Sequence, residues 1–313
     1  MKILIFVNTK LNLSNKSASG GIEILNIELA NYLKKKKLSV VLTNKIDKNI
    51  VETFWDVIIS SNDAKIFNKT ESKRKILWLH NKLQIEKSLR KCQLLPILSN
   101  KIEAIFVSKY LEKNTSKFYN FYKRNIIANF LPKIFTKKKI IYKNYSKKIF
   151  IWSVQREKGL DYVLDLWIEK IHSDYPNAEF HIFSVNKKNN KKFKSNNIFF
   201  HGRVKRSKLI NFYQKATGMI CLGYDETFCL NAIESMSMGL PVISLGKTAL
   251  SELIINDING IKIDNLSQVE KSIIKLINLD NISRKKLTYS TKKFSKKFFP
   301  AKILEQWRSL ILK

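Results

Sequence analysis

The chain has 313 residues, a length that suits two domains of about 150 residues each. Hydrophobic residues make up 44% of it, with only 9 glycines and 5 prolines, which excludes a disordered chain, a collagen-like repeat and a coiled coil. The formal net charge is +33, and lysine supplies 50 of the 58 basic residues.

The basic residues are spread through almost every segment instead of forming one arm. A protein that reads nucleic acid is expected to favour arginine, whose guanidinium group grips phosphate and guanine through two hydrogen bonds. We therefore attribute the charge to A/T-rich codon usage, which enriches lysine, asparagine and isoleucine together, and expect no nucleic acid partner. A positive surface still attracts anionic groups within a Debye length of about 8–10 Å, so an anionic membrane surface is an expected partner.

Cysteine usage and the first residues of the chain bear on its location. Cys92, Cys221 and Cys229 are odd in number and lack the spacing of metal ligands, which argues against a disulfide framework or a zinc site and favours a reducing cytosol. The apolar run from Ile3 to Val7 is too short for a signal-peptide core, and we expect a buried first strand. The expected location is the cytoplasm, with peripheral attachment to the inner face of the membrane.

Short apolar runs alternate with amphipathic stretches, a pattern typical of parallel sheets covered by helices. The first half of the chain contains six predicted strands: Ile3–Val7, Ser39–Thr43, Val57–Ser60, Ile76–Leu79, Ala104–Val107 and Ile126–Ala128. A helix is predicted between the first two, from about Gly21 to Lys35, with apolar side chains at helical spacing.

A polar, lysine-rich stretch from Lys137 to Lys148 interrupts this pattern, and we interpret it as the connection between two domains. The second half contains six more predicted strands: Ile149–Trp152, Glu179–Phe183, Ile198–Phe200, Gly218–Cys221, Val242–Ser244 and Ile261–Ile263. The clearest predicted helix follows the first of these strands, from Leu160 to Ile171, and a last helix is predicted from Pro300.

These elements predict an α/β protein built from two Rossmann-like domains that face each other across a cleft. The expected boundaries are residues 1–142 for the first domain and 143–299 for the second. Residues 300–313 are expected to form a helix that crosses back to the first domain, because its apolar stripe needs a surface to cover it.

Ligands of open α/β sheets bind beyond the carboxyl ends of the strands, near helix N-termini. Gly20 and Gly21 precede the first predicted helix, but the pattern Gly-x-Gly-x-x-Gly is missing, which disfavours an NAD-dependent oxidoreductase. Arg156 and Lys158 precede the helix at Leu160, where cations do not suit the helix dipole but an anionic diphosphate would. A chain this rich in lysine also has basic residues at such positions by chance, so the alternative that Arg156 and Lys158 bind no ligand stays open.

A third turn is more informative, because it contains two carboxylates eight residues apart. Glu226 lies in the turn before a predicted helix and Glu234 lies about two turns inside it, so both side chains could reach one site. Asp225 and Glu226 would also suit a helix N-terminus as ordinary charges, an alternative that does not explain Glu234.

Other short motifs accompany the two glutamates. They are Gly20-Gly21, Trp78-Leu79-His80-Asn81, Val107-Ser108-Lys109, Asn129-Phe130-Leu131-Pro132, Arg156-Glu157-Lys158-Gly159-Leu160-Asp161, Phe200-His201-Gly202-Arg203-Val204, Gly239-Leu240-Pro241-Val242, Ser251-Glu252-Leu253-Ile254 and Asn259-Gly260-Ile261. With this ordered set the chain resembles the retaining, nucleotide-sugar-dependent glycosyltransferases of the GT-B fold, specifically the family 4 group among the group 1 glycosyl transferases. The resemblance covers nearly the whole chain and is most specific from about Ile149 to Ile263.

The resemblance implies a hexosyltransferase of cell-envelope polysaccharide biosynthesis. It would move a sugar from a nucleotide diphosphate sugar to a glycan or lipid-linked saccharide acceptor, with retained anomeric configuration and attack on the face from which the phosphate leaves. The nucleotide sugar is a substrate, and no cofactor is expected. The chain has no Asp-x-Asp motif, so we also expect no divalent metal requirement.

The resemblance also implies the residues that bind the donor. Lys158 would bind the diphosphate, helped by three backbone amides, and Glu234 would hold the ribose hydroxyls. Many family members have an arginine five residues before the lysine, where this chain has Ser153, and Arg156 is the candidate substitute. The remaining implied donor contacts are the amides of Phe228, Cys229 and Leu230, the segment at Arg203 and Val204 beside the base, and Gly20 and Gly21 of the first domain.

Two residues would be catalytic by the same resemblance. Glu226 would lie beside the transferred sugar, and His80 would touch the sugar or the acceptor. His80 ends a predicted strand, so a structural histidine is its alternative reading. The Cys229 side chain is expected to be a small buried group and not a nucleophile.

Two other functions stay open at the level of sequence. One is a GT-B-fold epimerase or phosphorylase, which would use the same motifs. The other is a basic nucleic-acid-binding protein, although a cluster of arginine and aromatic residues or a recognition-helix motif is not visible.

Overall fold

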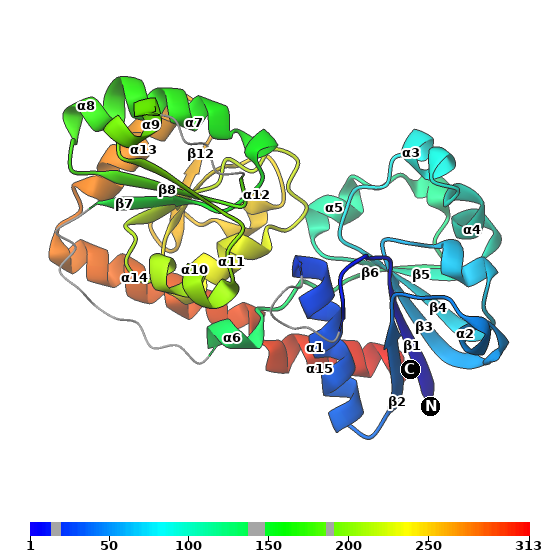
Figure 1. The fold of residues 1–313 in the computed structure, drawn as a ribbon. Coiled ribbons are helices and arrows are strands. Elements are labelled where there is room, and N and C mark those ends of the chain that lie inside the picture. The colour runs from blue at the N-terminus through cyan, green and yellow to red at the C-terminus, as the bar shows by residue number, and fades with distance from the viewer. Residues whose placement is uncertain (14–19, 137–147, 186–190) are drawn as a thin grey trace. The chain divides into compact units, whose positions relative to one another are not determined.

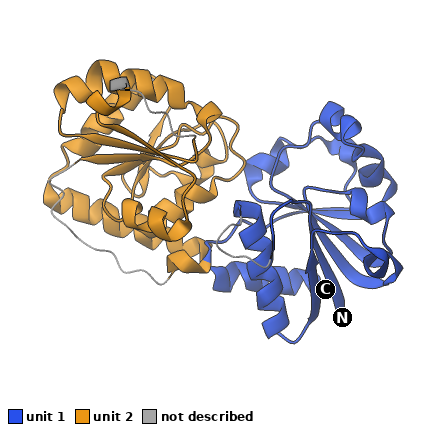
Figure 2. Ribbon diagram, viewed as in Figure 1, with its two compact units in different colours: residues 1–132, 300–313 blue, residues 133–299 orange. Residues whose placement is uncertain are grey.

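The computed structural model describes residues 1–13, 20–136, 148–185 and 191–313. The chain divides into two compact units, Met1–Pro132 with Pro300–Lys313, and Lys133–Phe299 (Figure 2). The first unit therefore ends ten residues before the expected domain end at 142, a correction that the helix at Lys133–Thr136 explains. This helix buries Phe135 against helices of the second unit. The lysine-rich connection predicted at 137–148 lies almost wholly outside the described residues.

A six-stranded parallel sheet forms the centre of the first unit, in the order β2-β1-β3-β4-β5-β6 (Figure 1). The strands are β1 (Lys2–Val7), β2 (Ser39–Thr43), β3 (Trp55–Ser61), β4 (Ser72–Leu79), β5 (Ile102–Phe106) and β6 (Lys123–Ile126). Ile3, Leu4 and Ile5 of β1, an interior strand of this sheet, are fully buried, as expected for a strand covered on both faces.

A second six-stranded parallel sheet forms the centre of the second unit, in the order β12-β11-β10-β7-β8-β9. The strands are β7 (Ile149–Trp152), β8 (Glu179–Phe183), β9 (Ile198–Gly202), β10 (Gly218–Ile220), β11 (Val242–Leu245) and β12 (Gly260–Ile263). The strand order reverses between β7 and β10, and such a reversal is where ligands bind in open α/β sheets.

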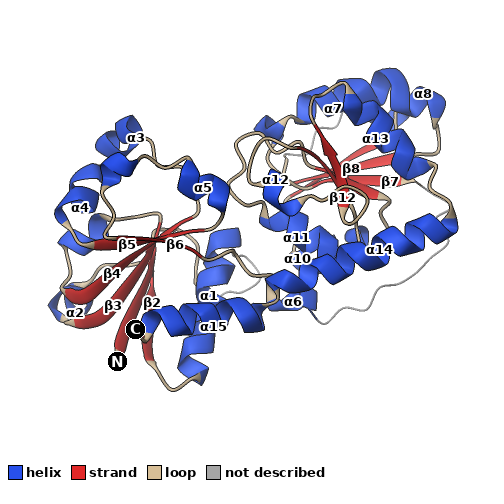
Figure 3. Ribbon diagram, turned by 180° about the vertical axis from the view of Figure 1, so that it is seen from behind, coloured by secondary structure: helices blue, strands red, loops and turns tan. Residues whose placement is uncertain are grey.

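Helices cover the sheet of each unit (Figure 3). Those of the first unit are α1 (Gly21–Lys35), α2 (Lys48–Glu52), η1 (Lys65–Asn68), α3 (Ile85–Arg90), α4 (Leu94–Ser99), α5 (Lys109–Lys113), η2 (Lys117–Tyr119) and α15 (Pro300–Ile311). Those of the second unit are α6 (Lys133–Thr136), η3 (Arg156–Lys158), α7 (Leu160–Leu166), η4 (Trp167–Ile171), α8 (His172–Asp174), α9 (Lys191–Ser195), α10 (Arg206–Tyr213), α11 (Leu230–Ser237), α12 (Leu250–Leu253), α13 (Gln268–Ile277), α14 (Asn281–Ser295) and η5 (Lys296–Phe298).

The strand predicted at Ile126–Ala128 is wrong in position, because β6 occupies Lys123–Ile126. β6 is an edge strand with one neighbour, β5, so its residues need not be apolar. Arg124 at its centre pairs with Glu112 at 2.8 Å and lies over the Phe106 ring. An apolar run therefore does not mark this strand.

The last helix, α15, packs within the first unit. The fully buried ring of Trp307 lies 4.6 Å from the ring of Trp78 in β4. Arg74 fixes the end of the helix, because it donates hydrogen bonds to the carbonyls of Leu310 and Ile311 while it pairs with a glutamate of β5. Cations suit the C-terminal end of a helix, whose last carbonyls have no intrahelical donors. No helix within the described ranges is both long and apolar enough to cross a bilayer.

Candidate active site

The best-supported site of the second unit lies beyond the carboxyl ends of β7 and β10, where the strand order reverses. After β10 the chain turns sharply before α11 begins at Leu230. Gly223 makes this turn possible, because its φ is +76° and an added Cβ would collide with the Leu250 side chain. The turn brings Glu226 to the carboxyl-terminal end of the sheet, where the turn after β7 also lies.

Lys158 and Glu226 meet at this end of the sheet. The Lys158 Nζ lies 3.9 Å from the Glu226 Oε1, and the two side chains are only 14% and 16% exposed. Burial raises the pKa of Glu226 above its ordinary value, the Lys158 ammonium group opposes this rise, and Asp225 adds to it. Lys158 ends the short η3 turn, and Gly159 follows it with a φ of +106°, a conformation that side chains rarely adopt.

α11 begins four residues after Glu226. Cys229 precedes its first turn in a left-handed conformation, with a φ of +66°, and Phe228 is buried against the Phe298 ring at 5.8 Å. The first turn of an α-helix leaves N–H groups without intrahelical acceptors, and the helix dipole makes this end positive. Leu230, the first residue of the helix, is half-buried. An anion is the ligand that this end would stabilise.

Glu234 lies inside α11 and is 1% exposed. The Arg206 Nε donates a hydrogen bond to the Glu234 Oε1 at 3.1 Å, from the first residue of α10. Burial raises the pKa of Glu234, and Arg206 opposes the rise by its charge and its hydrogen bond. The two predicted glutamates thus differ: each lies beside its own cation, and Glu226 is the more exposed of the two.

The other residues predicted to bind the donor have different surroundings. Arg156 donates two hydrogen bonds to Asp161, Nε to Oδ2 at 3.1 Å and Nη2 to Oδ1 at 2.5 Å, and this contact raises the pKa of Arg156. A phosphate would have to compete with Asp161 for this guanidinium group. Arg203 and Val204 lie in the loop between β9 and α10, where Arg203 is exposed and Val204 is half-buried.

The place of the family's usual arginine is filled by a small buried side chain. Ser153 is fully buried, and its hydroxyl lies 2.9 Å from the Tyr213 hydroxyl. Asn231 of α11 donates a hydrogen bond to the Ser153 carbonyl, which ties the turn after β7 to the start of α11. Ser153 therefore brings no positive charge to the turn after β7, and Lys158 is the residue of this turn that pairs with Glu226.

Three predicted residues belong to the first unit. Gly20 precedes α1 and Gly21 begins it, and both are half-buried. His80 follows β4 and is 6% exposed, with its ring 4.6 Å from that of Trp78. Burial lowers the pKa of His80 to about 3, so the imidazole is neutral at physiological pH.

Cysteine packing at the site differs from what the sequence spacing indicated. The Cys221 and Cys229 sulfurs lie 3.6 Å apart and are both buried. With a carboxylate oxygen of Glu226 they form a group whose ligand atoms all lie within 4.8 Å of one another. Their hydrogen bond, followed by burial, raises the pKa of Cys229 well above its ordinary value, so the thiol is not an activated nucleophile.

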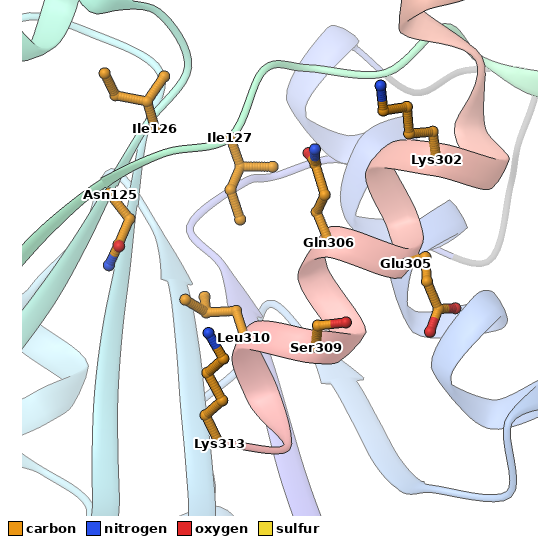
Figure 4. Close-up of a pocket in the computed structure, with 9 residues that line it drawn as sticks. All are labelled: Asn125, Ile126, Ile127, Lys302, Glu305, Gln306, Ser309, Leu310 and Lys313. Atoms are coloured by element: carbon orange, nitrogen blue, oxygen red, sulfur yellow. The ribbon is translucent and has the colours of Figure 1, made fainter.

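A groove of about 560 Å³ lies elsewhere, in the first unit between the end of β6 and α15 (Figure 4). Its lining comprises Asn125, Ile126, Ile127, Lys302, Glu305, Gln306, Ser309, Leu310 and Lys313. Glu305 has the only acidic side chain among these lining residues, and it already accepts hydrogen bonds from Tyr32 and Arg308. None of the site residues predicted from the sequence lines it, so this groove is not part of the candidate active site.

The sequence profile of the family described as Glycosyl transferases group 1 matches residues 133–294, more than half of the chain. The chain belongs to this family. The matched range contains both glutamates, both of their cations and the whole of α11, so the candidate active site described above belongs to a glycosyltransferase.

Solved structures share the fold of this glycosyltransferase over 99% of its length. Sucrose-phosphate synthase from Thermosynechococcus elongatus matches with a TM-score of 0.74 at 14% identity over 98% of that chain. Anabaena HepE, solved in complex with UDP and glucose, matches with a TM-score of 0.71 at 14% identity over 99% of that chain. WaaG, a glycosyltransferase involved in lipopolysaccharide biosynthesis, matches with a TM-score of 0.70 at 11% identity over 99% of that chain. No curated protein matches significantly in a sequence search.

Four residues of the glycosyltransferase site were missed by sequence reasoning: Arg206, Tyr213, Asn231 and Cys221. Each acts as a partner of a predicted residue or segment, and none belongs to a motif of its own. Arg206 carried one available signal, because a cation at the first position of a helix does not suit the dipole and indicates a specific anionic partner.

Proposed function

We propose that this glycosyltransferase is a retaining hexosyltransferase that uses a nucleoside diphosphate sugar and transfers its sugar to a glycan or lipid-linked saccharide. The close approach of Lys158 to Glu226, next to the first turn of α11, carries the proposal. It combines a cation and helix amides that suit a diphosphate with a carboxylate that suits sugar hydroxyls.

The donor diphosphate would be held without a metal ion. The Lys158 ammonium group would form an ion pair with a phosphate oxygen. It already lies in a partly buried position, where solvent screens a charge pair little. The amides of Phe228, Cys229 and Leu230 would donate to the same group at the positive end of α11. Arg156 would add a contact only by leaving Asp161, so we expect it to contribute less than Lys158.

The nucleoside would lie toward the other glutamate. Glu234 would accept hydrogen bonds from the ribose hydroxyls through its carboxylate, which Arg206 holds in place. Arg203 and Val204, in the loop that leads to Arg206, would contact the base. Gly20, Gly21 and His80 are the residues of the first unit to which the proposal gives a role in binding the donor or the acceptor.

The chemical step would proceed on one face of the sugar. The bond between the anomeric carbon and the diphosphate oxygen breaks, the acceptor hydroxyl oxygen bonds to the same carbon from the same face, and its proton passes to the departing phosphate. A double displacement would require a carboxylate against the opposite face of the ring. Glu226 would instead orient the sugar and stabilise the positive charge that develops on it, once Lys158 pairs with the phosphate.

The exposed surface of α3 and α4 supports the proposal of a lipid-linked acceptor. Four apolar side chains of these helices are exposed: Ile85, Leu89, Leu95 and Leu98. Lys87 and Arg90 of α3 are exposed as well. Apolar residues next to basic ones suit the interface of an anionic bilayer, so these two helices are the proposed membrane contact. The role of WaaG in lipopolysaccharide biosynthesis is consistent with such an acceptor.

The function is tested with donors first, because ligand that binds the folded state raises its stability. Thermal unfolding is measured with UDP-, GDP- and ADP-sugars for the native chain, for Lys158→Ala and for the control Lys170→Ala, an exposed lysine of the same unit. One class of nucleotide sugar should raise the Tm of the native chain and of the control, and should fail with Lys158→Ala.

The donor that binds is then used to measure transfer. NMR of the product should show the anomeric configuration of the donor, and the rate should be unchanged by EDTA. An inverted product, or a rate that EDTA abolishes and Mn²⁺ or Mg²⁺ restores, contradicts the proposed mechanism. Conversion of the donor without any acceptor would favour an epimerase, and release of a sugar phosphate would favour a phosphorylase.

A further inference from the structure

Two thiols lie beside the glutamate of the active site, in a chain of only three cysteines. The sulfurs of Cys221 and Cys229 are 3.6 Å apart, and a Glu226 carboxylate oxygen completes a group within 4.8 Å. The two cysteines are eight residues apart in sequence, so the turn after β10 brings them together by folding back on itself.

The backbone at Cys229 brings the two thiols together in a strained conformation. Its φ of +66° is a left-handed conformation that residues with a Cβ seldom adopt and that glycine adopts freely. Cys221 follows directly after β10 and is fully buried, so its thiol has a fixed position. The Cys229 thiol is therefore held in a strained turn beside a second thiol. Filling this space with a small apolar side chain would not require such a backbone conformation.

The spacing of these atoms matches the coordination of a soft divalent cation. Zn²⁺ binds cysteine sulfur at about 2.3 Å in a tetrahedral arrangement, which places two sulfur ligands roughly 3.8 Å apart. The observed separation of 3.6 Å is within a few tenths of an ångström of this value. Two sulfurs and one carboxylate would supply three ligands and leave a fourth position for water.

We propose that Cys221, Cys229 and Glu226 form a binding site for a thiophilic divalent cation such as Zn²⁺. On binding, both thiols release their protons to solvent and form metal–sulfur bonds, and a Glu226 oxygen occupies a third position. The Glu226 side chain is 16% exposed, and the cation would reach the buried thiols from its side. Bound cation would withdraw Glu226 from the sugar and inhibit transfer, a consequence that rests on the function proposed above.

The site is tested by direct binding, without any reaction. Co²⁺ bound to thiolates absorbs in the near ultraviolet, so the chain is titrated with Co²⁺ under a phosphine reductant, and Zn²⁺ is then used to displace it. The native chain should bind one equivalent with the thiolate band. The control Cys92→Ser, which removes the exposed third cysteine, should do the same.

Removing a ligand should abolish this signal. Cys221→Ser, and Cys229→Gly whose new residue suits the left-handed backbone, should lose the thiolate band, with circular dichroism showing that each is folded. Loss of an outer-shell partner alone weakens metal binding by about 10–100-fold, so loss of a ligand should weaken Zn²⁺ binding at least about tenfold. Glu226→Gln should keep the thiolate band and bind Zn²⁺ more weakly.

The results separate the two proposals. Absence of the band in the native chain, its persistence in Cys221→Ser, or its loss in Cys92→Ser overturns the site. If the band behaves as expected but micromolar Zn²⁺ leaves the transfer rate unchanged, the inhibitory consequence is overturned. If no transfer is found with any donor while the band behaves as expected, the proposed function fails and the cation site stands.

Discussion

Glu226 and Glu234 are chemically identical side chains eight residues apart, and their different surroundings suit them to different tasks. Glu226 is partly exposed beside Lys158, a cation that a bound phosphate could draw away. Glu234 is 1% exposed and held by the hydrogen bond from Arg206. A carboxylate that can lose its cation suits a step in which charge develops, whereas a fixed one suits binding.

The two glutamates should therefore fail differently when they are replaced. Glu226→Gln should lower kcat by about 100-fold with little change in donor affinity, because it removes a stabilising charge in the transition state. Glu234→Ala should weaken donor binding by about 1.5–3 kcal/mol, the contribution of hydrogen bonds to a charged group. Steady-state kinetics and donor titrations separate the two effects.

Glu169→Gln serves as the control, since Glu169 is an exposed glutamate of the same unit. It should match the native chain in both measurements. A Glu226→Gln protein that is folded and transfers sugar at the native rate would remove Glu226 from the active site.

His80 should make the stability of the first unit depend on pH. Burial lowers its pKa to about 3 in the folded state, against 6.5 for the free side chain. As the pH falls below about 6.5, the unfolded state therefore takes up a proton that the folded state does not. The contribution of His80 to the free energy of unfolding is complete above about pH 6.5. Below that pH, stability should fall by about 1.4 kcal/mol per pH unit.

Thermal unfolding between pH 7 and pH 4.5 checks this expectation. His80→Gln should flatten the acid loss of Tm relative to the native chain, whereas His172→Gln should leave the loss in place because His80 remains. Equal slopes for His80→Gln and the native chain would show that other groups cause the acid dependence.

At the scale of elements, most of the expected strands and the first helix occur where the sequence places them. Ser39–Thr43, Ile149–Trp152 and Glu179–Phe183 are strands with the same ends as in the structure, and Gly21–Lys35 is a helix. In buried strands and amphipathic helices, the order of apolar and polar residues reflects which side chains are buried, so the hydrophobic periodicity of the sequence predicts them. The edge strand β6 does not, because half of its surroundings is solvent.

Helix α15 supplies a prediction about stability. Trp307 is fully buried against Trp78, so Trp307→Ala should destabilise the first unit by about 3–5 kcal/mol through the cavity it leaves. Leu312→Ala is the control, because Leu312 is 46% exposed just beyond the helix and its loss should cost less than about 0.5 kcal/mol.

Differential scanning calorimetry measures both variants of α15. The transition of the first unit should move to lower temperature in Trp307→Ala and stay in place in Leu312→Ala. Equal transitions for Trp307→Ala and the native chain would mean that α15 contributes nothing to the stability of this unit.

At the scale of the whole molecule, the charge of +33 and the exposed apolar residues of α3 and α4 predict binding to anionic membranes. Each lysine or arginine close to an anionic surface contributes about 1 kcal/mol, and salt screens the attraction. Co-sedimentation with vesicles containing phosphatidylserine should be strong at low salt and weak at high salt, and absent with neutral vesicles.

Two variants show whether α3 and α4 make the contact. Leu95→Ser should weaken vesicle binding by about tenfold, because the leucine side chain can no longer bury its apolar surface in the lipid. Ile282→Ser, at a residue of the second unit that is 81% exposed, should bind as the native chain does. If neither variant weakened vesicle binding, the binding would be assigned to charge alone.

The sequence by itself determined the α/β class, the buried strands, the family and the segment that contains both glutamates, because each of these is encoded in residues close together along the chain. The partners of the glutamates were decided by the tertiary structure alone. Lys158 reaches Glu226 because β7 and β10, far apart in the sequence, are neighbours in the sheet. Arg206 reaches Glu234 from a different helix, α10, and the turn before α11 folds Cys229 back onto Cys221. Local patterns report which residues are buried, whereas sheet order and backbone conformation decide which of them meet.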